Sequence, residues 1–230
     1  MRGSMLRDAG TLLQGYIGTA REFGPRYRWP TLVRVACAAN RPGLRISVRS
    51  SRSDDGPLHS ARETAEARTA GIAEYLKSNG QSSRSARALH SLADWWLQDS
   101  GRDSESPLAW ERPAEAFREE LRALPGVSLT LADRILLFVG GLPVFPVDRA
   151  ALRIACRHGW MEQTAEYDEW QSFFTRESAE ARIQLTDLAH WLSAIGGEFC
   201  GAKPQCEQCP LRALLPACGP VPLTEGDQDV

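Results

Sequence analysis

Four of the six cysteines in this 230-residue chain gather near its carboxyl end. They lie within the nineteen residues CGAKPQCEQCPLRALLPAC, at Cys200, Cys206, Cys209 and Cys218. Because no apolar secretory signal opens the chain, thiols at this density predict a metal site rather than disulfides. Four thiolates can close a tetrahedral zinc site or hold a cubane iron–sulfur cluster. Structural zinc usually uses two CxxC pairs, and the single pair here favours a [4Fe–4S] cluster, with zinc as the alternative.

One aspartate, Asp148, follows the loop GGLPVFP at residues 140–146 and stands at the start of an apolar helical run. An aspartate in this position is a common N-cap, because its carboxylate accepts a hydrogen bond from an N–H group that opens the helix. Taken alone, the position therefore predicts a capping residue.

A second break, LPGV at residues 124–127, separates two helical patterns and predicts a helical hairpin. Pro125 cannot continue a helix and Gly126 can take a positive φ. The N–H groups that open the next helix have no intrahelical acceptor and can bind a phosphate. Gly126, Val127 and Ser128 are therefore candidate contacts to a DNA backbone, and an ordinary helix–helix turn is the alternative.

Apolar residues recur at helical spacing along almost the whole chain, which predicts an all-α protein. The remaining cysteines, Cys37 and Cys156, and most tryptophans share this spacing and are expected in the core. The single candidate strand is LRISVRS at 44–50. Helices are expected near residues 5–22, 30–39, 62–78, 83–98, 114–123, 129–140, 148–158, 166–174, 178–195 and 207–215.

Composition and charge bound the classes of protein that this chain can belong to. With 43% hydrophobic residues, it can bury one large or two small cores. No apolar run approaches the roughly 18 to 20 residues that a membrane span needs, so we expect a cytoplasmic protein. The net charge is −2, yet residues 1–52 carry ten arginines against Asp8 and Glu22. One basic face is compatible with nucleic-acid binding.

Taken together, the hairpin at 114–140, the Gly/Pro-rich loop, Asp148 and the four later cysteines resemble the endonuclease III family of DNA glycosylases. The resemblance is strongest from about residue 114 to 218 and weaker from about 29 to 100, where SNGQSSRSARALHSLADWW is similar to a family loop and helix. It implies a six-helix domain at 28–142 and an iron–sulfur domain built from 1–27 and 143–230. Double-stranded DNA, with its flipped nucleotide, would bind in the cleft between them.

The resemblance also implies a chemistry, the removal of a damaged or mismatched base from duplex DNA. Breaking an N-glycosidic bond develops positive charge on the sugar, which the carboxylate of Asp148 would stabilise. Family members that also cleave the strand use a lysine near the start of the second hairpin helix. Thr130 occupies that catalytic position here, and a hydroxyl cannot form an imine. We therefore predict a monofunctional glycosylase in which Asp148 also helps to activate water.

Other positions depart from the family pattern and leave the substrate open. Ser128 replaces the second hairpin glycine, and Arg149 with Ala150 replaces the Thr-His pair after the aspartate. Asn40 stands where a glutamine often fills the gap left by the flipped base, and Gln81 stands where a leucine wedge is common. The cysteine spacing differs as well. An oxidised pyrimidine is one candidate lesion, and a mispaired adenine, or thymine or uracil opposite guanine, is the rival.

Basic side chains should supply the remaining DNA contacts, and the alternative for each is a solvated surface charge. The candidates for phosphate binding are Arg84, Arg149, Lys203 and Arg212. A monomer with no nucleotide cofactor and no membrane partner is expected. The rival class of function is a non-catalytic relative that binds damaged or bent DNA, and a zinc-stabilised scaffold unrelated to DNA is a third.

Overall fold

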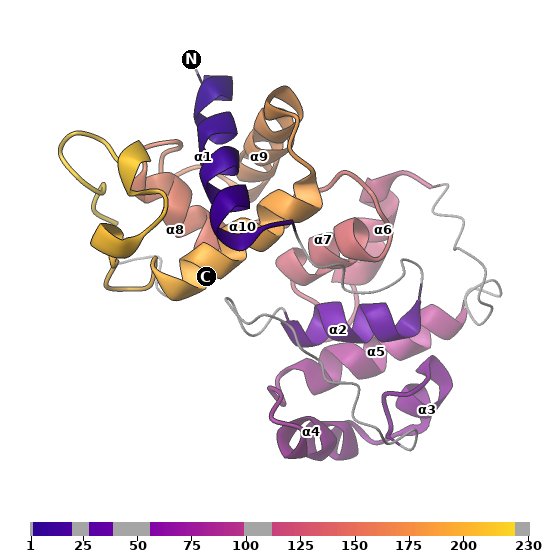
Figure 1. Ribbon diagram of the computed structural model, residues 1–230. Helices are drawn as coiled ribbons and strands as arrows, with labels where there is room; N and C mark the ends of the chain where they lie inside the picture. The colour runs from indigo at the N-terminus through magenta and orange to yellow at the C-terminus, as the bar shows by residue number, and fades with distance from the viewer. Residues whose placement is uncertain (1, 20–27, 39–55, 99–111, 224–230) are drawn as a thin grey trace. The chain divides into compact units, whose positions relative to one another are not determined.

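The computed structural model describes residues 2–19, 28–38, 56–98 and 112–223, and these form helices and loops only (Figure 1). Within these ranges the chain forms ten α-helices and two short 3₁₀ helices. The prediction of an all-α protein is confirmed. The candidate strand at 44–50 and the candidate residue Asn40 lie outside the described residues. Among the described helices, none is both long and apolar enough to cross a membrane.

Residue contacts divide the chain into two compact units. The described part of the first comprises residues 2–19 and 143–223, and we call it the cysteine unit. The described part of the second comprises residues 28–38, 56–98 and 112–142, and we call it the hairpin unit.

The hairpin unit is organised around one central helix, α5, against which α2, α3 and α4 pack, while α7 packs against α2 and α6. On α5, Leu89 and Leu92 are completely buried, and Trp96 meets Trp29 of α2 edge to face. Cys37 is buried as expected, and burial raises the pKa of its thiol to about 11. The helices are α2 (Trp29–Ala38), α3 (Ala61–Glu66), α4 (Thr69–Ser78), α5 (Ser85–Gln98), α6 (Ala114–Arg122) and α7 (Leu129–Phe138).

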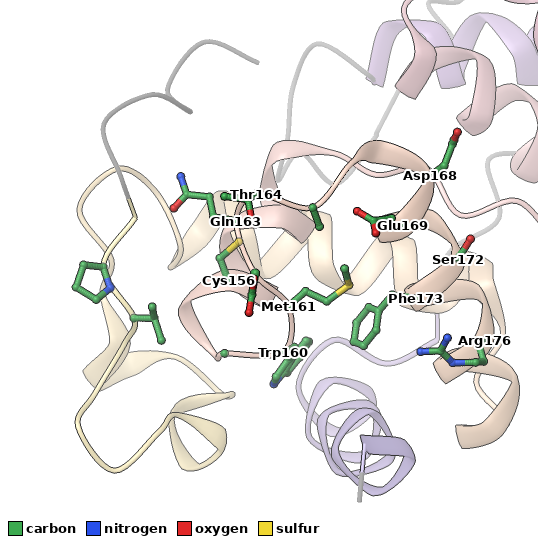
Figure 2. A pocket seen from close by; sticks show the side chains of 15 residues that line it. Cys156, Trp160, Met161, Gln163, Thr164, Asp168, Glu169, Ser172, Phe173 and Arg176 are labelled. Carbon is green, nitrogen blue, oxygen red and sulfur yellow. The ribbon is translucent and has the colours of Figure 1, made fainter.

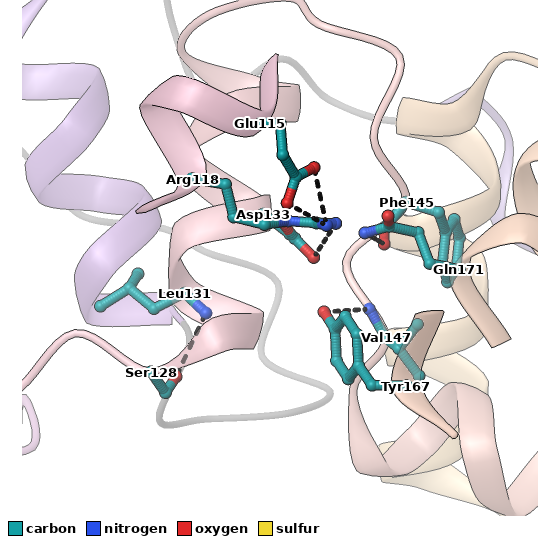
Figure 3. A network of polar contacts seen from close by, with 9 residues as sticks. All are labelled: Glu115, Arg118, Ser128, Leu131, Asp133, Phe145, Val147, Tyr167 and Gln171. Atoms are coloured by element: carbon teal, nitrogen blue, oxygen red, sulfur yellow. Dashed lines mark hydrogen bonds and ion pairs between the residues drawn. The ribbon is translucent and has the colours of Figure 1, made fainter. Parts of the chain in front are cut away.

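A buried ion pair joins α6 to α7 (Figure 3). Arg118 donates from Nε to Asp133 Oδ1 at 2.8 Å and from Nη2 to Oδ2 at 3.2 Å. Both side chains are buried, and Glu115 adds a third contact to the guanidinium at 3.3 Å. Loss of either buried partner would leave the other charge desolvated and unpaired, which would destabilise the contact between the two hairpin helices.

In the cysteine unit, α1 packs against α9 and α10, and α8 packs against α10 (Figure 1). Leu6 and Leu13 of α1 are completely buried, and Trp191 of α10 donates from Nε1 to the carbonyl of Gly18 at 2.6 Å. The N-terminal helix is therefore an integral part of this unit. The helices are α1 (Arg2–Ile17), α8 (Arg149–Arg157), α9 (Tyr167–Ala181), α10 (Leu185–Glu198), η1 (Cys206–Gln208) and η2 (Arg212–Leu214).

Five predicted helices, at 5–22, 62–78, 166–174, 178–195 and 207–215, were wrong in extent or type, and the first of them ends at Ile17. The helix expected at 62–78 is two helices, because Ala67 and Arg68 are extended, with ψ of 145° and 139°. Neither residue is a helix breaker by type. The break lets the buried residues of α3 and those of α4 pack separately against α5.

The break expected near residue 175 is also wrong, because α9 continues to Ala181. It ends at Arg182, whose φ of 59° is left-handed, and Ser178 Oγ donates to the carbonyl of Ile183 at 2.6 Å. The helix expected at 207–215 is replaced by η1 and η2. Two prolines, Pro204 and Pro210, lie before these turns and help to prevent a longer helix.

Two helical glycines offer a matched test of packing. A Cβ on Gly196 of α10 would lie 2.2 Å from the Cβ of Ala150 on α8, whereas a Cβ on Gly15 of α1 would meet nothing within 4 Å. We expect Gly196→Ala to lower the free energy of unfolding by about 1 to 3 kcal/mol through overpacking. Gly15→Ala should raise it by roughly 0.5 to 1 kcal/mol through helix propensity. Urea denaturation measures both, and equal effects of the two changes would contradict the close contact between α8 and α10.

Candidate functional site

The hairpin turn at 124–127 has the hydrogen bond and residue types of a type II turn. Val127 N donates to the carbonyl of Leu124 at 3.1 Å, and Gly126 has a φ of +84°. A Cβ on Gly126 would lie 2.9 Å from the backbone nitrogen of Ala88 on α5. Both conformation and space therefore require glycine at this position.

The same turn is attached to α5 by a side chain, since Ser91 Oγ donates to the carbonyl of Pro125 at 2.9 Å. Val127 is buried beneath the turn, whereas Gly126 and Ser128 are exposed. The hairpin is thus held on a fixed helix with part of its backbone accessible.

Ser128 is the N-cap of α7, and its Oγ accepts a hydrogen bond from Leu131 N at 3.2 Å (Figure 3). Its φ of −80° is ordinary extended backbone, so this position does not require the glycine that the family pattern has there. The serine satisfies one of the N–H groups that open the helix. Thr130, half-buried, is the second residue of α7.

Asp148 is the N-cap of α8, as predicted. Its Oδ1 accepts a hydrogen bond from Ala151 N at 2.8 Å, and its side chain is half-buried. The N-terminal end of a helix carries partial positive charge, which stabilises a carboxylate there. The sequence therefore places a fixed anionic group directly after the Gly/Pro-rich loop.

The loop before Asp148 is bound by two side chains of α9 (Figure 3). Tyr167 accepts a hydrogen bond at Oη from Val147 N at 3.2 Å, and Gln171 donates from Nε2 to the carbonyl of Phe145 at 3.2 Å. The ring of Phe145 stacks on Phe174 with centroids 4.3 Å apart. Sequence reasoning did not identify these α9 residues, because nothing in their spacing indicates contact with the loop.

Three of the four clustered cysteines line one small cavity. Cys200, Cys206 and Cys209 border it together with residues of α8 and η2, whereas Cys218 is exposed and does not line it. Within the part of the chain that the structure describes, no three Cys, His, Asp or Glu side chains are close enough to hold a metal ion. Thiolates are donors that both zinc and iron–sulfur clusters take, so the chemistry of the donor set fits either metal.

Burial and hydrogen bonding have opposite effects on the pKa of the Cys200 thiol in this cavity. Burial raises the pKa of the Cys200 thiol, while the hydrogen bond from Arg157 lowers it. Burial likewise raises the pKa of the Cys209 thiol. Because metal ligands must be thiolates, bound metal would supply the positive charge that these buried sulfurs require.

Two arginines of α8 hold the cysteine loop and were missed from the sequence. Arg153 donates from Nε to the carbonyl of Cys200 at 2.7 Å. Arg157 donates to Cys200 Sγ at 3.1 Å and to the carbonyl of Gly201 at 2.7 Å. Their spacing does not indicate the cysteine loop; the sequence shows only that Arg157 ends an apolar helical run, where a buried charge needs some partner.

The predicted DNA contacts belong to both units. In the hairpin unit, Gln81 is half-buried and its N–H donates to the carbonyl of Leu76 at 2.7 Å, while Arg84 is exposed just before α5. In the cysteine unit, Arg149, Lys203 and Arg212 are exposed. Arg212 already pairs with Glu207 at 2.8 Å, an exposed ion pair that contributes little to stability.

Two larger cavities occur in the cysteine unit. A groove of about 1100 Å³ lies along α9, with buried Trp160 and Phe173 and exposed carboxylates of Asp168 and Glu169 (Figure 2). The exposed carboxylate of Glu162 also lines it. These three carboxylates outnumber the one cation of the lining, Arg176, so the groove is net negative and does not favour phosphate. The second, of about 650 Å³, borders the first turn of α8 and is lined in part by Arg149.

Comparisons of sequence give relatives among DNA glycosylases. The chain is 26% identical over 205 residues to DNA glycosylase/AP lyase ROS1 of Arabidopsis thaliana, covering 81% of this chain and 14% of the relative. It is 32% identical over 104 residues to endonuclease III of Sulfolobus acidocaldarius, covering 44% of this chain and 45% of the relative. The matches thus span less than half the length of these two curated relatives. No protein-family model matches the chain.

Comparisons of structure give the same fold. A trapped endonuclease III–DNA covalent intermediate superposes with a TM-score of 0.61 at 17% identity, covering 92% of this chain and 94% of that one. A non-covalent endonuclease III–DNA complex gives 0.63 at 18% identity, covering 93% and 94%. A thermostable thymine-DNA glycosylase gives 0.59 at 15% identity, with the same coverage as that complex. The predicted resemblance is confirmed, and the chain is endonuclease III-like in sequence and fold.

The capping role of Asp148 can be measured apart from any catalytic role. Asp148→Ala removes the acceptor for Ala151 N and should lower the free energy of unfolding by about 1 kcal/mol. Asp148→Asn keeps an acceptor oxygen and should cost only a few tenths of a kcal/mol. Urea denaturation of both variants checks this, and equal losses would show that the cap hydrogen bond does not account for the effect.

Proposed function

We propose that this chain is a DNA glycosylase of base excision repair that hydrolyses the N-glycosidic bond of a damaged or mismatched base in duplex DNA. The observation that carries the proposal is the placement of Asp148, a carboxylate fixed at the start of α8 directly after the Gly/Pro-rich loop. The endonuclease III-like sequence and fold support a role on DNA for this placement, because the resemblance to that family rests on the same loop and aspartate.

The proposed reaction uses the charge of that carboxylate. The target base leaves the stack at a cost of a few kcal/mol and enters a pocket. As the bond to the base breaks, positive charge develops at the anomeric carbon, and the ionised Asp148 stabilises it. The base departs with the electron pair of the broken bond and takes up a proton from solvent. Asp148 accepts a proton from the water whose oxygen bonds to the anomeric carbon, so the products are the free base and an abasic sugar, with no covalent intermediate.

The absence of a strand-cleaving step follows from the residue at the start of α7. Thr130 stands where the family's Schiff-base lysine is expected, and its hydroxyl cannot form an imine. The chain has only two lysines, Lys77 and Lys203. Both are exposed, the first in the last turn of α4 and the second in the cysteine loop, and we assign phosphate or solvent contact to them.

The proposed grip on DNA combines backbone donors with basic side chains. The turn of Gly126 and Ser128 would bind a phosphate through backbone N–H groups, and Gln81 would stand at the wedge position beside the flipped base. Charged contacts to phosphates would come from the exposed basic residues Arg84, Arg149, Lys203 and Arg212.

We also propose that the cysteine unit is an iron–sulfur domain, with Cys200, Cys206, Cys209 and Cys218 as ligands of a [4Fe–4S] cluster. Three of these side chains already line one cavity, and Arg157 and Arg153 hold the loop that begins at Cys200. When bound, the cluster would cross-link the loop that carries Lys203. The hairpin unit would then be the six-helix domain of the same enzyme.

A base-release assay tests the proposed function. A panel of duplexes carrying an oxidised pyrimidine, a mispaired adenine, or thymine or uracil opposite guanine is incubated with the protein, with and without alkali. We expect cleaved strand only after alkali, because the abasic product remains intact without a lyase step. Asp148→Asn should slow release by about a hundredfold or more, as for loss of a charge-stabilising group, with DNA affinity nearly unchanged.

Two results would contradict parts of this proposal. A covalent adduct trapped by borohydride would exclude a monofunctional enzyme. Tight DNA binding with no release on any duplex, in either form, would favour the non-catalytic DNA binder.

Metal analysis tests the cluster. We expect about four iron atoms per chain and broad visible absorbance in the purified protein. Cys218→Ser should lower the iron content and the absorbance, whereas Cys37→Ala, in the core of the hairpin unit, should leave both unchanged. Stoichiometric zinc in place of iron would support the alternative metal.

A further inference from the structure

We propose that Tyr167 and Gln171 of α9 are positioning residues that set the orientation of the loop backbone delivering Asp148. The inference rests on the proposed function for its kinetic consequence, and on the contacts of the cysteine unit alone for its geometry. Neither side chain needs to touch DNA for this role.

The two hydrogen bonds bracket Pro146 (Figure 3). Gln171 Nε2 donates to the carbonyl of Phe145, which belongs to the peptide group before the proline, at 3.2 Å. Tyr167 Oη accepts from Val147 N, which belongs to the peptide group after it, at 3.2 Å. Because proline restricts its own φ, fixing these two peptide planes determines the path of the chain into Asp148.

The helix that provides these groups has a rigid start. Glu166 and Glu169 form a capping box, in which Glu169 Oε2 accepts from Glu166 N at 2.8 Å. Trp170, three residues after Tyr167, is buried and donates from Nε1 to the carbonyl of Ala165 at 3.1 Å. Tyr167 and Gln171 are four residues apart, so they project from one face of this fixed first turn.

Apolar packing alone does not replace these hydrogen bonds. Phe145 and Val147 are buried, and Phe145 stacks on Phe174. Such contacts hold the loop against α9. Dispersion forces are non-directional, however, and do not select the rotation of a peptide plane. The hydrogen bonds are directional, so they control where the carboxylate of Asp148 is placed.

Placement is what a charge-stabilising carboxylate depends on. When a mutation far from the reacting atoms displaces a catalytic group by about 1 Å, the rate can fall by as much as a hundredfold. Loss of one of the two hydrogen bonds should therefore reduce the rate of base release, while the DNA contacts and the fold remain.

The test compares Tyr167→Phe with Tyr16→Phe, in single-turnover base release on a duplex that the wild-type protein processes. Tyr16 is the matched control, because its hydroxyl donates to Glu198 on the surface of the same unit at 3.2 Å. We expect Tyr167→Phe to slow release about tenfold, with DNA Kd and urea midpoint nearly unchanged. Gln171→Met, which removes the donor but keeps the shape, should act in the same direction, and Tyr16→Phe should match wild type.

A double-mutant cycle tests whether Tyr167 affects the rate by positioning Asp148. In an Asp148→Asn background, Tyr167→Phe should cause no further loss, because the group that it positions has lost its charge. The same tenfold loss in both backgrounds, or a wild-type rate in Tyr167→Phe, would overturn the inference.

Amide hydrogen exchange separates this inference from the proposed function. In Tyr167→Phe, the amide of Val147 should exchange about tenfold faster than in wild type, while amides within α9 exchange as before. If the wild-type protein releases no base, the proposed function fails, and this exchange measurement still decides the loop contact. Unchanged exchange at Val147 would overturn it.

Discussion

The hydrogen bond from Ala151 N to Asp148 Oδ1 fixes the start of α8, the helix that both the Gly/Pro-rich loop and the cysteine loop contact. It fixes the first residue of α8, a helix of only nine residues, and a helix this short relies on its cap and its packing for stability. The same contact orients a carboxylate at the end of a loop. Structural and proposed chemical roles therefore coincide in one side chain, and the two are compatible because a cap needs only an acceptor oxygen.

Helix α8 connects the two proposed centres of this unit. At its start, Asp148 ends the Gly/Pro-rich loop, and Ala150 packs so closely against Gly196 of α10 that no side chain fits between them. One and two turns later, Arg153 and Arg157 hold the backbone of the cysteine loop. The proposed carboxylate and the proposed cluster ligands are therefore joined by contacts of a single nine-residue helix.

The hairpin unit combines an exposed turn backbone with contacts that fix the conformation of that turn. Gly126 permits close approach to α5, and Ser91 binds the turn from the side. The buried pair of Arg118 and Asp133 joins the two hairpin helices. These contacts fix the turn before any ligand binds. The N–H groups at the start of α7 would therefore lose little conformational entropy when they bind one.

By itself, the sequence determined the all-α class, most helix positions, the turn at Gly126 and the cap at Asp148, because these depend on local periodicity and backbone chemistry. It also identified the four clustered cysteines, which depend only on spacing. Tertiary structure alone decided the break between α3 and α4, the contacts of Arg157 with the cysteine loop and the hydrogen bond from Val147 to Tyr167 in the loop before Asp148. These join residues from separate elements, and the free energy of such contacts depends on packing geometry that residue type and spacing do not encode.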